Sequence, residues 1–439
     1  MFSDTFLGKI SYFLIKKSLQ TLKTKLDPRN RNGALFLGLN GIVVKSHGGA
    51  DDLSFAAAID IALEFSKEGV GDKIVNGLNS FNYKKRLTLN AGNSGTLGRL
   101  LMGLLVHSKV RIKVLGDKSL SKRDFLRVTN PLRKFGAKFQ TNKGKLPIII
   151  SGTDYSKPIS YFEKKGSAQC KSSIMLAALN TKGTTTIKAR KSRDHTELLF
   201  NYLGLPINII KKKNYDFIKI TGKKNIKPIN YNIPSDISSC AFFIVLTTLS
   251  KNSKLKIQNI NVNPTRIGVL KILKKMGANI KLQNYKTYKG EKIADLVVKS
   301  KKSLKAIKCP QNLNSAAIDE FLLIFLVAAK AKGVSYFRNL SELNQKESPR
   351  LFWGAKILTK MGVKNVLKRD SIKIYGNPNL KVNKKIIIEK FLKDHRVFMS
   401  SVVAALTIGG EWKINDKESV NTSFPTFLSK IKSLGAKIN

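Results

Sequence analysis

The chain has few cysteines and no long apolar segment, and both shortages limit what it can be. Its 439 residues include only three cysteines, Cys170, Cys240 and Cys309, which lie far apart and show no CxxC spacing. This pattern argues against a disulfide framework and a structural zinc site, and it favours a reducing compartment. No apolar run approaches the roughly 20 residues that span a bilayer. We therefore expect a cytoplasmic protein without a transmembrane segment.

Acidic residues are also scarce. The chain contains 28 Asp and Glu against 80 Lys and Arg, so its formal net charge is +52. Such a balance is compatible with nucleic acid, acidic lipid or phosphorylated substrates as partners. The lysines are scattered along the chain, however, and no RNA-binding aromatic motif, zinc finger or helix-turn-helix signature occurs. We therefore expect no nucleic-acid partner.

Five apolar stretches each open with a short polar cluster, at steps of about 70 to 85 residues. The clusters begin at Asn93, Ser167, Ser235, Asp319 and Asp394. About 40 residues after each cluster, a glycine follows a large apolar residue. These glycines are Gly136, Gly204, Gly277, Gly362 and Gly435. A fixed period with two markers in phase predicts one supersecondary unit that is used repeatedly.

Each unit is expected to contain a buried helix, a strand, an exposed helix and further strands. Residues 321–329 are apolar nearly all round, which is typical of a buried helix. The Ser, Asn and Asp residues of the polar clusters are those that cap helix N-termini. Residues 267–276 have apolar residues at helical spacing, and a β-branched stretch follows at 278–282. Several buried helices that aim their N-termini at one place would form a positive site for anions.

Nine short motifs occur in a fixed order over about residues 76–439. They lie at residues 90–99, 166–169, 191–197, 234–243, 263–268, 318–320, 346–350, 394–396 and 422–425. Among them are Asn-Ala-Gly-Asn-Ser-Gly-Thr-Leu-Gly-Arg at 90–99 and Ser-Arg-Asp-His-Thr-Glu at 192–197. In this order they resemble the 5-enolpyruvylshikimate-3-phosphate synthases, also called 3-phosphoshikimate 1-carboxyvinyltransferases. The resemblance implies an α/β enolpyruvyl transferase fold of two domains, in which βαβαββ-type units surround buried parallel helices and the active site lies between the domains.

The resemblance also implies a reaction and its residues. The enolpyruvyl (carboxyvinyl) group of phosphoenolpyruvate would move to the 5-hydroxyl of shikimate-3-phosphate with release of phosphate, in chorismate and aromatic amino acid biosynthesis and without a metal or organic cofactor. Phosphoenolpyruvate would be bound by Asn93, Gly95, Thr96, Arg123, Gln169, Arg350 and Arg396. Shikimate-3-phosphate would be bound by Ser167, Ala168, Gln169, Arg193, Asp319 and Lys346. The catalytic residues would be Asp319, which takes the hydroxyl proton, Lys346, which assists, and Glu347, which moves a proton at the methylene carbon.

Six units make up the family fold, whereas we count five. The family's first unit opens with Lys-Ser-x-Ser-x-Arg, which contacts both substrates, but one step before Asn93 the chain has only Ser-Leu-Gln-Thr-Leu at 18–22. Residues 1–75 instead resemble the C-terminal end of phosphate acyltransferase of phospholipid synthesis. We therefore expect a fusion joined near residues 72–78, with an incomplete first enolpyruvyl transferase domain at 76–231 that lacks one of its three repeats, and a second domain at 232–439. Without that repeat, the isolated chain is expected to be inactive or nearly so.

Other features of the motifs suggest smaller expectations. Pro349 stands where the family usually has Asp, and Asn344 stands where Arg or a similar residue is common. Because proline is tolerated in the first turn of a helix, we expect the local geometry to survive. His195 and His395 each follow an Asp and precede a helix, so we expect structural or anion-orienting roles for them. The protein is expected to be a monomer.

Two other classes of function stay open. An enolpyruvyl transferase that acts on UDP-N-acetylglucosamine shares the fold, although the segments at 192–197 and 346–350 fit the shikimate enzyme better. Competition between shikimate-3-phosphate and the UDP-sugar would separate these two. A basic scaffold or nucleic-acid binder would show a steep salt dependence of binding. An inactive fusion remnant would bind nothing.

Overall fold

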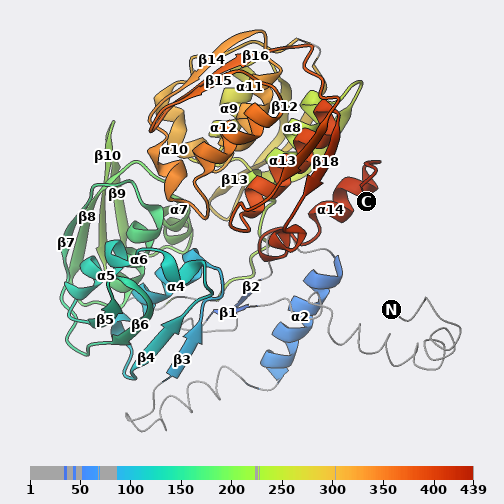
Figure 1. Ribbon diagram of the computed structural model, residues 1–439. Helices are drawn as coiled ribbons and strands as arrows, with labels where there is room; N and C mark the ends of the chain where they lie inside the picture. The colour runs from blue at the N-terminus through green and yellow to red at the C-terminus, as the bar shows by residue number, and fades with distance from the viewer. Residues whose placement is uncertain are drawn as a thin grey trace, which may run out of the picture. The chain divides into compact units, whose positions relative to one another are not determined.

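The computed structural model describes residues 34–36, 43–45, 52–67, 69, 87–222, 226, 228–301 and 303–438 (Figure 1). By its internal contacts the chain forms two compact units. Unit 1 comprises residues 1–80 and 423–439, and unit 2 comprises residues 81–422. The join expected at residues 72–78 lies outside the described residues, and the domain boundaries after residues 75 and 231 stay a prediction.

Unit 1 contains two short strands and two helices among its described residues. Strands β1 (Ala34–Phe36) and β2 (Val43–Lys45) pair antiparallel. Helix α2 spans Asp52–Lys67, and α14 (Phe427–Ser433) lies near the C-terminus. Phe55, Ile59 and Leu63 are about half exposed and recur at every fourth position, so α2 carries an apolar stripe on its surface.

The amino-terminal half of unit 2, residues 87–222, contains the same supersecondary unit twice. The first copy is β3 (Leu87–Asn90), α4 (Gly95–Leu104), β4 (Ile112–Leu115), α5 (Leu126–Arg133), β5 (Lys138–Asn142) and β6 (Lys145–Ser151). The second copy is β7 (Ser160–Glu163), α6 (Ala168–Leu179), β8 (Thr184–Arg190), α7 (His195–Tyr202), β9 (Ile207–Lys211) and β10 (Tyr215–Thr221). The strand orders β3-β4-β6-β5 and β7-β8-β10-β9 are equivalent, with the first pair parallel and the others antiparallel. The predicted repeat is therefore confirmed as a βαβαββ unit.

The carboxy-terminal half of unit 2, residues 228–422, contains two further copies and the βαβ part of a third. The first has α8 (Ile237–Leu249), β11 (Lys254–Asn261), α9 (Gly268–Lys275), β12 (Asn279–Tyr288) and β13 (Glu291–Lys299). The second has α10 (Asn314–Ala317), α11 (Phe321–Ala329), β14 (Gly333–Phe337), α12 (Arg350–Lys360), β15 (Asn365–Leu367) and β16 (Ile372–Gly376). The third has β17 (Lys385–Ile388), α13 (His395–Ile408) and β18 (Glu411–Ile414).

The sheets of the carboxy-terminal half have fewer strands than those of the amino-terminal half. The sheets are β11-β13-β12, β14-β16-β15 and the parallel pair β17-β18. In the first two copies the leading strand is reduced to isolated parallel bridges, such as Ser235 with Ile260 and Lys305 with Lys332. Short 3₁₀ helices occupy Leu105–His107, Leu120–Lys122, Gln311–Leu313, Ser341–Gln345 and Lys417–Thr422.

The five apolar stretches form the inner helices of unit 2. Helix α4 packs on α6 in the amino-terminal half, and α8, α11 and α13 pack on one another in the carboxy-terminal half. All nine residues of α11 are buried, whereas Leu97, Leu100, Leu101 and Leu104 on α4 are only partly buried. The described residues thus hold two inner helices in one half and three in the other. This is the arrangement expected when the first domain has two repeats instead of three.

Polar clusters cap four of the five inner helices. Ser94, Ser167, Asp236 and Asp394 have extended backbones, and their side chains accept a backbone N–H of the first turn. The expectation is wrong for α11, which begins after Glu320 without a side-chain cap. Glu320 has a ψ of 2°, whereas a capping residue needs an extended backbone. The short helix α10 ends only three residues earlier, so the chain is still close to a helical conformation when it reaches Glu320. The five marker glycines all have positive φ, which confirms the predicted turns.

Two glycines of α4 allow a matched test of how closely α4 and α6 pack. A Cβ at Gly103 would lie 2.1 Å from the backbone oxygen of Ser173 on α6, whereas the nearest atom to a Cβ at Gly98 is 3.5 Å away. We predict that Gly103→Ala lowers the free energy of unfolding by about 1–3 kcal/mol because the helices must move apart. Gly98→Ala should be neutral, or should stabilise the protein by up to about 1 kcal/mol through helix propensity. Urea denaturation followed by circular dichroism measures both, and equal effects would contradict the close approach.

Candidate functional site

Asp319 is the centre of a cluster of basic side chains. It lies just before α11, and its carboxylate contacts Arg193, Lys346 Nζ (3.5 Å) and Arg350 Nη1 (3.6 Å). Its backbone oxygen accepts a hydrogen bond from Arg396 Nη1 (3.0 Å). Burial alone would raise the pKa of Asp319, but the four cations hold it well below its usual range. The carboxylate is therefore ionised at neutral pH.

Glu347 is a second carboxylate of the same cluster. It accepts a hydrogen bond from Arg123 Nη2 (3.0 Å) and contacts Arg350 Nη2 (3.4 Å) and His395 Nδ1 (2.9 Å). Burial would raise its pKa, but His395, Arg350 and Arg123 lower it. Arg350 therefore contacts both Glu347 and Asp319, which links the two carboxylates into one network.

Arg350 itself is fixed by a third, fully buried carboxylate. Asp394 accepts hydrogen bonds from Arg350 Nε (2.8 Å) and Nη2 (3.2 Å), and from Ser348 N (3.2 Å) and Oγ (2.8 Å). It also accepts the backbone N–H of Arg396 (2.9 Å) and so caps α13. Burial would lower the pKa of Arg350, but Asp394 and Glu347 raise it. Pro349 immediately precedes α12 and is not in its first turn, and Arg350 begins that helix in contact with Asp319. The effect of this proline on the site stays a prediction.

Three other predicted residues meet where α4 and α6 begin. Gln169 Nε2 donates to Thr96 Oγ1 (2.8 Å), and Gln169 Oε1 accepts from Arg99 Nη1 (2.8 Å). A Cβ at Gly95 would lie 2.9 Å from Arg99 Nη1 and 3.4 Å from Arg123 Nη1. Glycine at this position therefore leaves room for both guanidinium groups. Through Arg123, the beginning of α4 adjoins the Asp319–Glu347 cluster.

The remaining predicted residues have local partners. Asn93 Nδ2 donates to Asp117 Oδ2 (2.5 Å), and Ser167 Oγ accepts the backbone N–H of Cys170 (3.2 Å) as the cap of α6. Ala168 is the first residue of that helix. These contacts place the three residues at the starts of α4 and α6, so any contact with a substrate stays a prediction.

Three supporting side chains lie inside the motifs although none was among the predicted catalytic or substrate-binding residues. Arg99, Glu320 and Asp394 are each at most 4 % exposed. Arg99 lies over the ring of Phe125 at 4.9 Å, and burial lowers its pKa to about 10. Glu320 lies 3.7 Å from Arg396 Nη1, and burial raises the pKa of this carboxyl group. Their position in the sequence could have indicated a supporting role, because each of the three begins or ends one of the nine motifs.

A second polar network joins the two halves of unit 2 beside Arg193. Asn263 Nδ2 donates to Asp194 Oδ1 (2.8 Å) and lies 3.3 Å from Glu291 Oε2. His195 Nδ1 contacts Glu291 Oε1. Burial would raise the pKa values of Asp194 and Glu291, but hydrogen bonds and nearby cations lower them. The partner of His195 is thus a carboxylate, which fits the structural role expected for this histidine.

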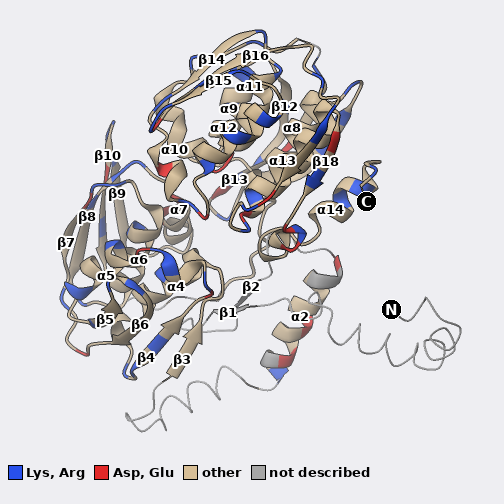
Figure 2. Cartoon of the chain, viewed as in Figure 1, with Lys and Arg blue, Asp and Glu red and all other residues tan. Residues whose placement is uncertain are grey.

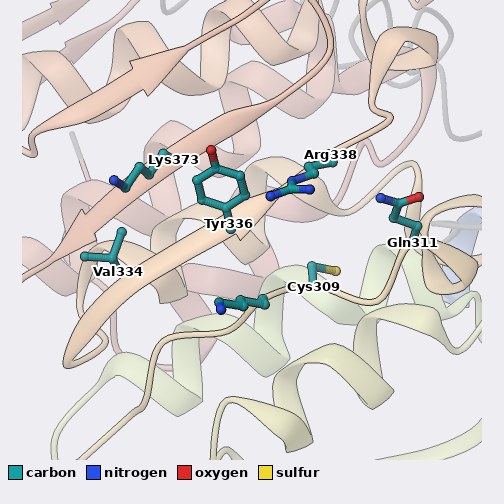
Figure 3. A pocket seen from close by; sticks show the side chains of 7 residues that line it. Cys309, Gln311, Val334, Tyr336, Arg338 and Lys373 are labelled. Carbon is teal, nitrogen blue, oxygen red and sulfur yellow. The ribbon is translucent and has the colours of Figure 1, made fainter.

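The described residues also contain features that lie outside the motifs. A pocket of about 450 Å³ on the sheet β14-β16-β15 is lined by Lys308, Cys309, Gln311, Val334, Tyr336, Arg338 and Lys373 (Figure 3). Arg338 lies over the ring of Tyr336 at 4.7 Å. Lys and Arg occur on described elements of both units (Figure 2), which agrees with their scattering in the sequence. We assign no function to this pocket because none of its residues belongs to a motif.

Two findings bear on the expected absence of a metal and of a membrane span. Within the described ranges, Glu347, Asp394 and His395 bring potential ligand atoms within 4.8 Å of one another. Those carboxylates already bind Arg123, Arg350 and Ser348, so we assign no ion to them, and the absence of a metal stays a prediction. No helix in the described part of the chain is long and apolar enough to cross a membrane.

The sequence matches the models of two protein families, and the two matches overlap at residues 58–73. Residues 58–431 match the model of the family EPSP synthase (3-phosphoshikimate 1-carboxyvinyltransferase), and residues 1–73 match that of the family Fatty acid synthesis protein. The 3-phosphoshikimate 1-carboxyvinyltransferase of Ruthia magnifica subsp. Calyptogena magnifica is 40% identical over 428 residues, which cover 95% of this chain and 96% of that protein. That of Petrotoga mobilis is 39% identical over 352 residues, or 79% of this chain and 80% of that protein.

Solved structures agree with the sequence comparison. The EPSP synthase from Acinetobacter baumannii superposes with a TM-score of 0.71 at 37% identity and covers 80% of each chain. The enolpyruvyl transferase NikO from Streptomyces tendae has a TM-score of 0.58 at 14% identity and covers 73% of each chain, which shows a shared fold. The predicted α/β enolpyruvyl transferase fold is therefore confirmed.

The depressed pKa of Glu347 predicts how stability depends on pH. Because the folded value lies below the ordinary 4.5, the ion pairs of Glu347 stabilise the fold above about pH 4.5, and this contribution is lost as the pH falls through the folded pKa. We expect Glu347→Gln to lower the free energy of unfolding by about 3 kcal/mol at pH 7, and the difference from the parent to shrink in acid. The measurement is urea denaturation between about pH 7 and pH 3.

Glu342→Gln is the matched control for this experiment. Glu342 also pairs with a cation of the cluster, Lys346, but its side chain is 59% exposed. Its replacement should therefore change stability by less than about 1 kcal/mol. A Glu347→Gln difference that stays constant across the pH range would contradict a lowered pKa of Glu347.

Proposed function

Because the chain belongs to the EPSP synthase (3-phosphoshikimate 1-carboxyvinyltransferase) family, we propose that it transfers the carboxyvinyl group of phosphoenolpyruvate to the 5-hydroxyl of shikimate-3-phosphate and releases phosphate. The observation that carries this proposal is the cluster of basic side chains on Asp319 and Glu347. Both substrates carry a phosphate and a carboxylate. Arginine binds such groups with two parallel hydrogen bonds, so the cluster suits these ligands.

In this proposal the substrates displace the two carboxylates from their cations. Arg123, Arg350 and Arg396 bind phosphoenolpyruvate, together with Gln169 and the residues at the start of α4, which are Asn93, Gly95 and Thr96. Arg193 and Lys346 bind shikimate-3-phosphate, together with the start of α6, which supplies Ser167, Ala168 and Gln169. The contact between Arg193 and Asp319 supports this assignment of residues to substrates. It brings Arg193, which is proposed to bind shikimate-3-phosphate, from the amino-terminal half against the proposed base in the carboxy-terminal half.

Asp319 is proposed to take the proton of the 5-hydroxyl as the hydroxyl oxygen attacks the substituted carbon of phosphoenolpyruvate. In the ligand-free protein its low pKa makes it a weak base, because cations surround it. Substrate anions that bind Arg193, Arg350 and Arg396 remove this stabilisation. The pKa of Asp319 then rises toward the range in which a carboxylate accepts protons efficiently.

Glu347 is proposed to move the proton at the methylene carbon. In the addition step this carbon gains a proton, and in the elimination step it loses one as the bond to phosphate breaks. Arg123, Arg350 and His395 keep Glu347 ionised before substrates bind. Phosphoenolpyruvate would take the two arginines, which raises the pKa of Glu347 and allows it to carry a proton between the two steps. The cations then stabilise the departing phosphate.

The proposal includes the setting of the reaction. Proton transfer and ion pairing account for the chemistry, so we propose that no metal or organic cofactor takes part. The three cysteines are free, which suits a cytoplasmic protein. We also propose that the protein acts as a monomer.

Activity is expected to be low, because no Lys-Ser-x-Ser-x-Arg segment opens a repeat ahead of Asn93. The one such segment in the sequence, at residues 118–123, lies inside the repeat that begins at Asn93. Loss of one donor to a developing charge costs about 10²–10³ in rate. We therefore predict turnover well below the ordinary range of about 1–1000 per second. The measurement is phosphate release by the purified chain with both substrates present, with each single omission and Asp319→Asn as controls. Calorimetric titration that detects binding of neither substrate would refute the function, whereas ordinary turnover would refute only the expected impairment.

Ligand competition separates the two enolpyruvyl transferase activities. We predict that shikimate-3-phosphate binds the chain and that a tenfold excess of UDP-N-acetylglucosamine leaves its dissociation constant unchanged. Arg193→Met should weaken shikimate-3-phosphate by about 10–100-fold, because a charge-assisted hydrogen bond contributes about 1.5–3 kcal/mol. Displacement of shikimate-3-phosphate by the UDP-sugar would favour the alternative substrate.

A further inference from the structure

Lys171 and Glu197 form an ion pair inside the amino-terminal half of unit 2. Lys171 lies on α6, where most neighbours are small or apolar, and its side chain is 0% exposed. Its Nζ contacts Glu197 Oε1 on α7, and the Glu197 side chain is 3% exposed. Removing two charges from water is costly, and well-packed apolar residues usually stabilise a core as well or better. The pair therefore calls for an explanation other than stability.

The position of the Lys171 ammonium group suggests such an explanation for the buried ion pair. Lys171 Nζ also donates a hydrogen bond to the backbone oxygen of Arg193 (3.0 Å). The next residue of α6 forms a second contact with the beginning of α7, because Ser172 Oγ lies 2.6 Å from Thr196 Oγ1. Arg193 is thus held at its backbone by α6, while its guanidinium group reaches Asp319 in the other half.

The contacts of Glu197 suggest that it orients the Lys171 ammonium group and does not mainly stabilise the core. Its Oε2 is buried without a hydrogen-bond partner among the described residues. A buried unpaired carboxylate oxygen carries a desolvation cost that a purely structural pair would avoid. Glu197 Oε1 fixes the ammonium group at the point from which it also reaches the Arg193 carbonyl.

We propose that Lys171 and Glu197 are positioning residues that set the Arg193 guanidinium group against Asp319 and thereby determine affinity for the phosphorylated hydroxyl substrate. The inference rests on the proposed function, in which Arg193 binds shikimate-3-phosphate. Neither residue touches a substrate in this scheme. A displacement of about 1 Å in a substrate-binding group can cost roughly 10²-fold in rate, so a single carbonyl anchor is enough to matter.

The principal test is the double variant Lys171→Met with Glu197→Met. It removes both charges together and replaces them with flexible apolar side chains, so the protein should stay folded with an unchanged or higher melting temperature. The dissociation constant for shikimate-3-phosphate should increase by about 10–100-fold. That for phosphoenolpyruvate should change by less than about threefold, because Arg350 and Arg396 are anchored independently by Asp394 and the backbone of Asp319.

Thr181→Val is the matched control. Thr181 is also fully buried, near the opposite end of α6, and its hydroxyl donates to the backbone oxygen of Ala177 (3.0 Å). Its replacement should leave both dissociation constants unchanged, whatever its effect on melting temperature. Equal weakening of the two ligands by the double variant, or a similar loss in Thr181→Val, would overturn the inference.

A ligand-independent measurement separates this inference from the proposed function. The guanidinium ¹⁵N resonance of Arg193, identified by its loss in Arg193→Lys, should shift in the double variant and stay in place in Thr181→Val. If the parent protein binds no shikimate-3-phosphate but the resonance shifts, the proposed function fails and the positioning role stands. A resonance that does not move shows that Lys171 and Glu197 leave Arg193 where it was, and the positioning role fails.

Discussion

The whole candidate site depends on the neutralisation of converging cations by Asp319. Two like charges about 4 Å apart repel by about 4 kcal/mol at an effective dielectric constant of 20. Arg193, Lys346 and Arg350 share the carboxylate of Asp319, and Arg396 binds its backbone oxygen. Without this negative centre the side chains would turn toward water. Asp319 therefore holds open an arrangement in which a phosphate or carboxylate of a ligand can take its place.

The repeated unit explains why such a centre can form from distant parts of the chain. Four of the five inner helices begin beside residues of the site, with Thr96 on α4, Gln169 on α6, Asp319 before α11 and Arg396 on α13. Repetition of one supersecondary unit places these beginnings in equivalent positions. Helix N-termini also favour negative charge, so the backbone and the basic side chains act in the same direction. Regular spacing in the sequence thus brings residues from distant repeats together in one site.

The buried polar groups around the site show what this arrangement costs. Asp394 and Arg350 are almost completely buried, and so are Lys171 and Glu197. Apolar residues in their places would give a more stable core. Their hydrogen bonds instead fix Arg350 and Arg193, whose positions decide which ligands the cluster can hold. In unit 2 the buried polar groups that orient the guanidinium groups of Arg350 and Arg193 therefore lower the stability of the fold.

Much of this protein could be predicted from its sequence, because period, helix capping and burial are local properties. Spacing of the polar clusters and of the glycine turns gave the five repeats, and the family motifs brought Arg193, Asp319, Lys346 and Glu347 onto one list. The exception among the caps was α11, since Glu320 has a conformation that a preceding short helix imposes.

The tertiary structure alone decided which charges meet. Asp319 could have faced any of the cations named by the motifs, and only the packing of the repeats shows that Arg193 crosses from the other half to reach it. The hydrogen bond from Lys171 to the Arg193 carbonyl could not be predicted either, because it joins α6 to a backbone atom of the segment before α7. Sequence determines which side chains are present and on which elements. Distances between elements follow from how their apolar faces pack, and electrostatic interactions depend on those distances.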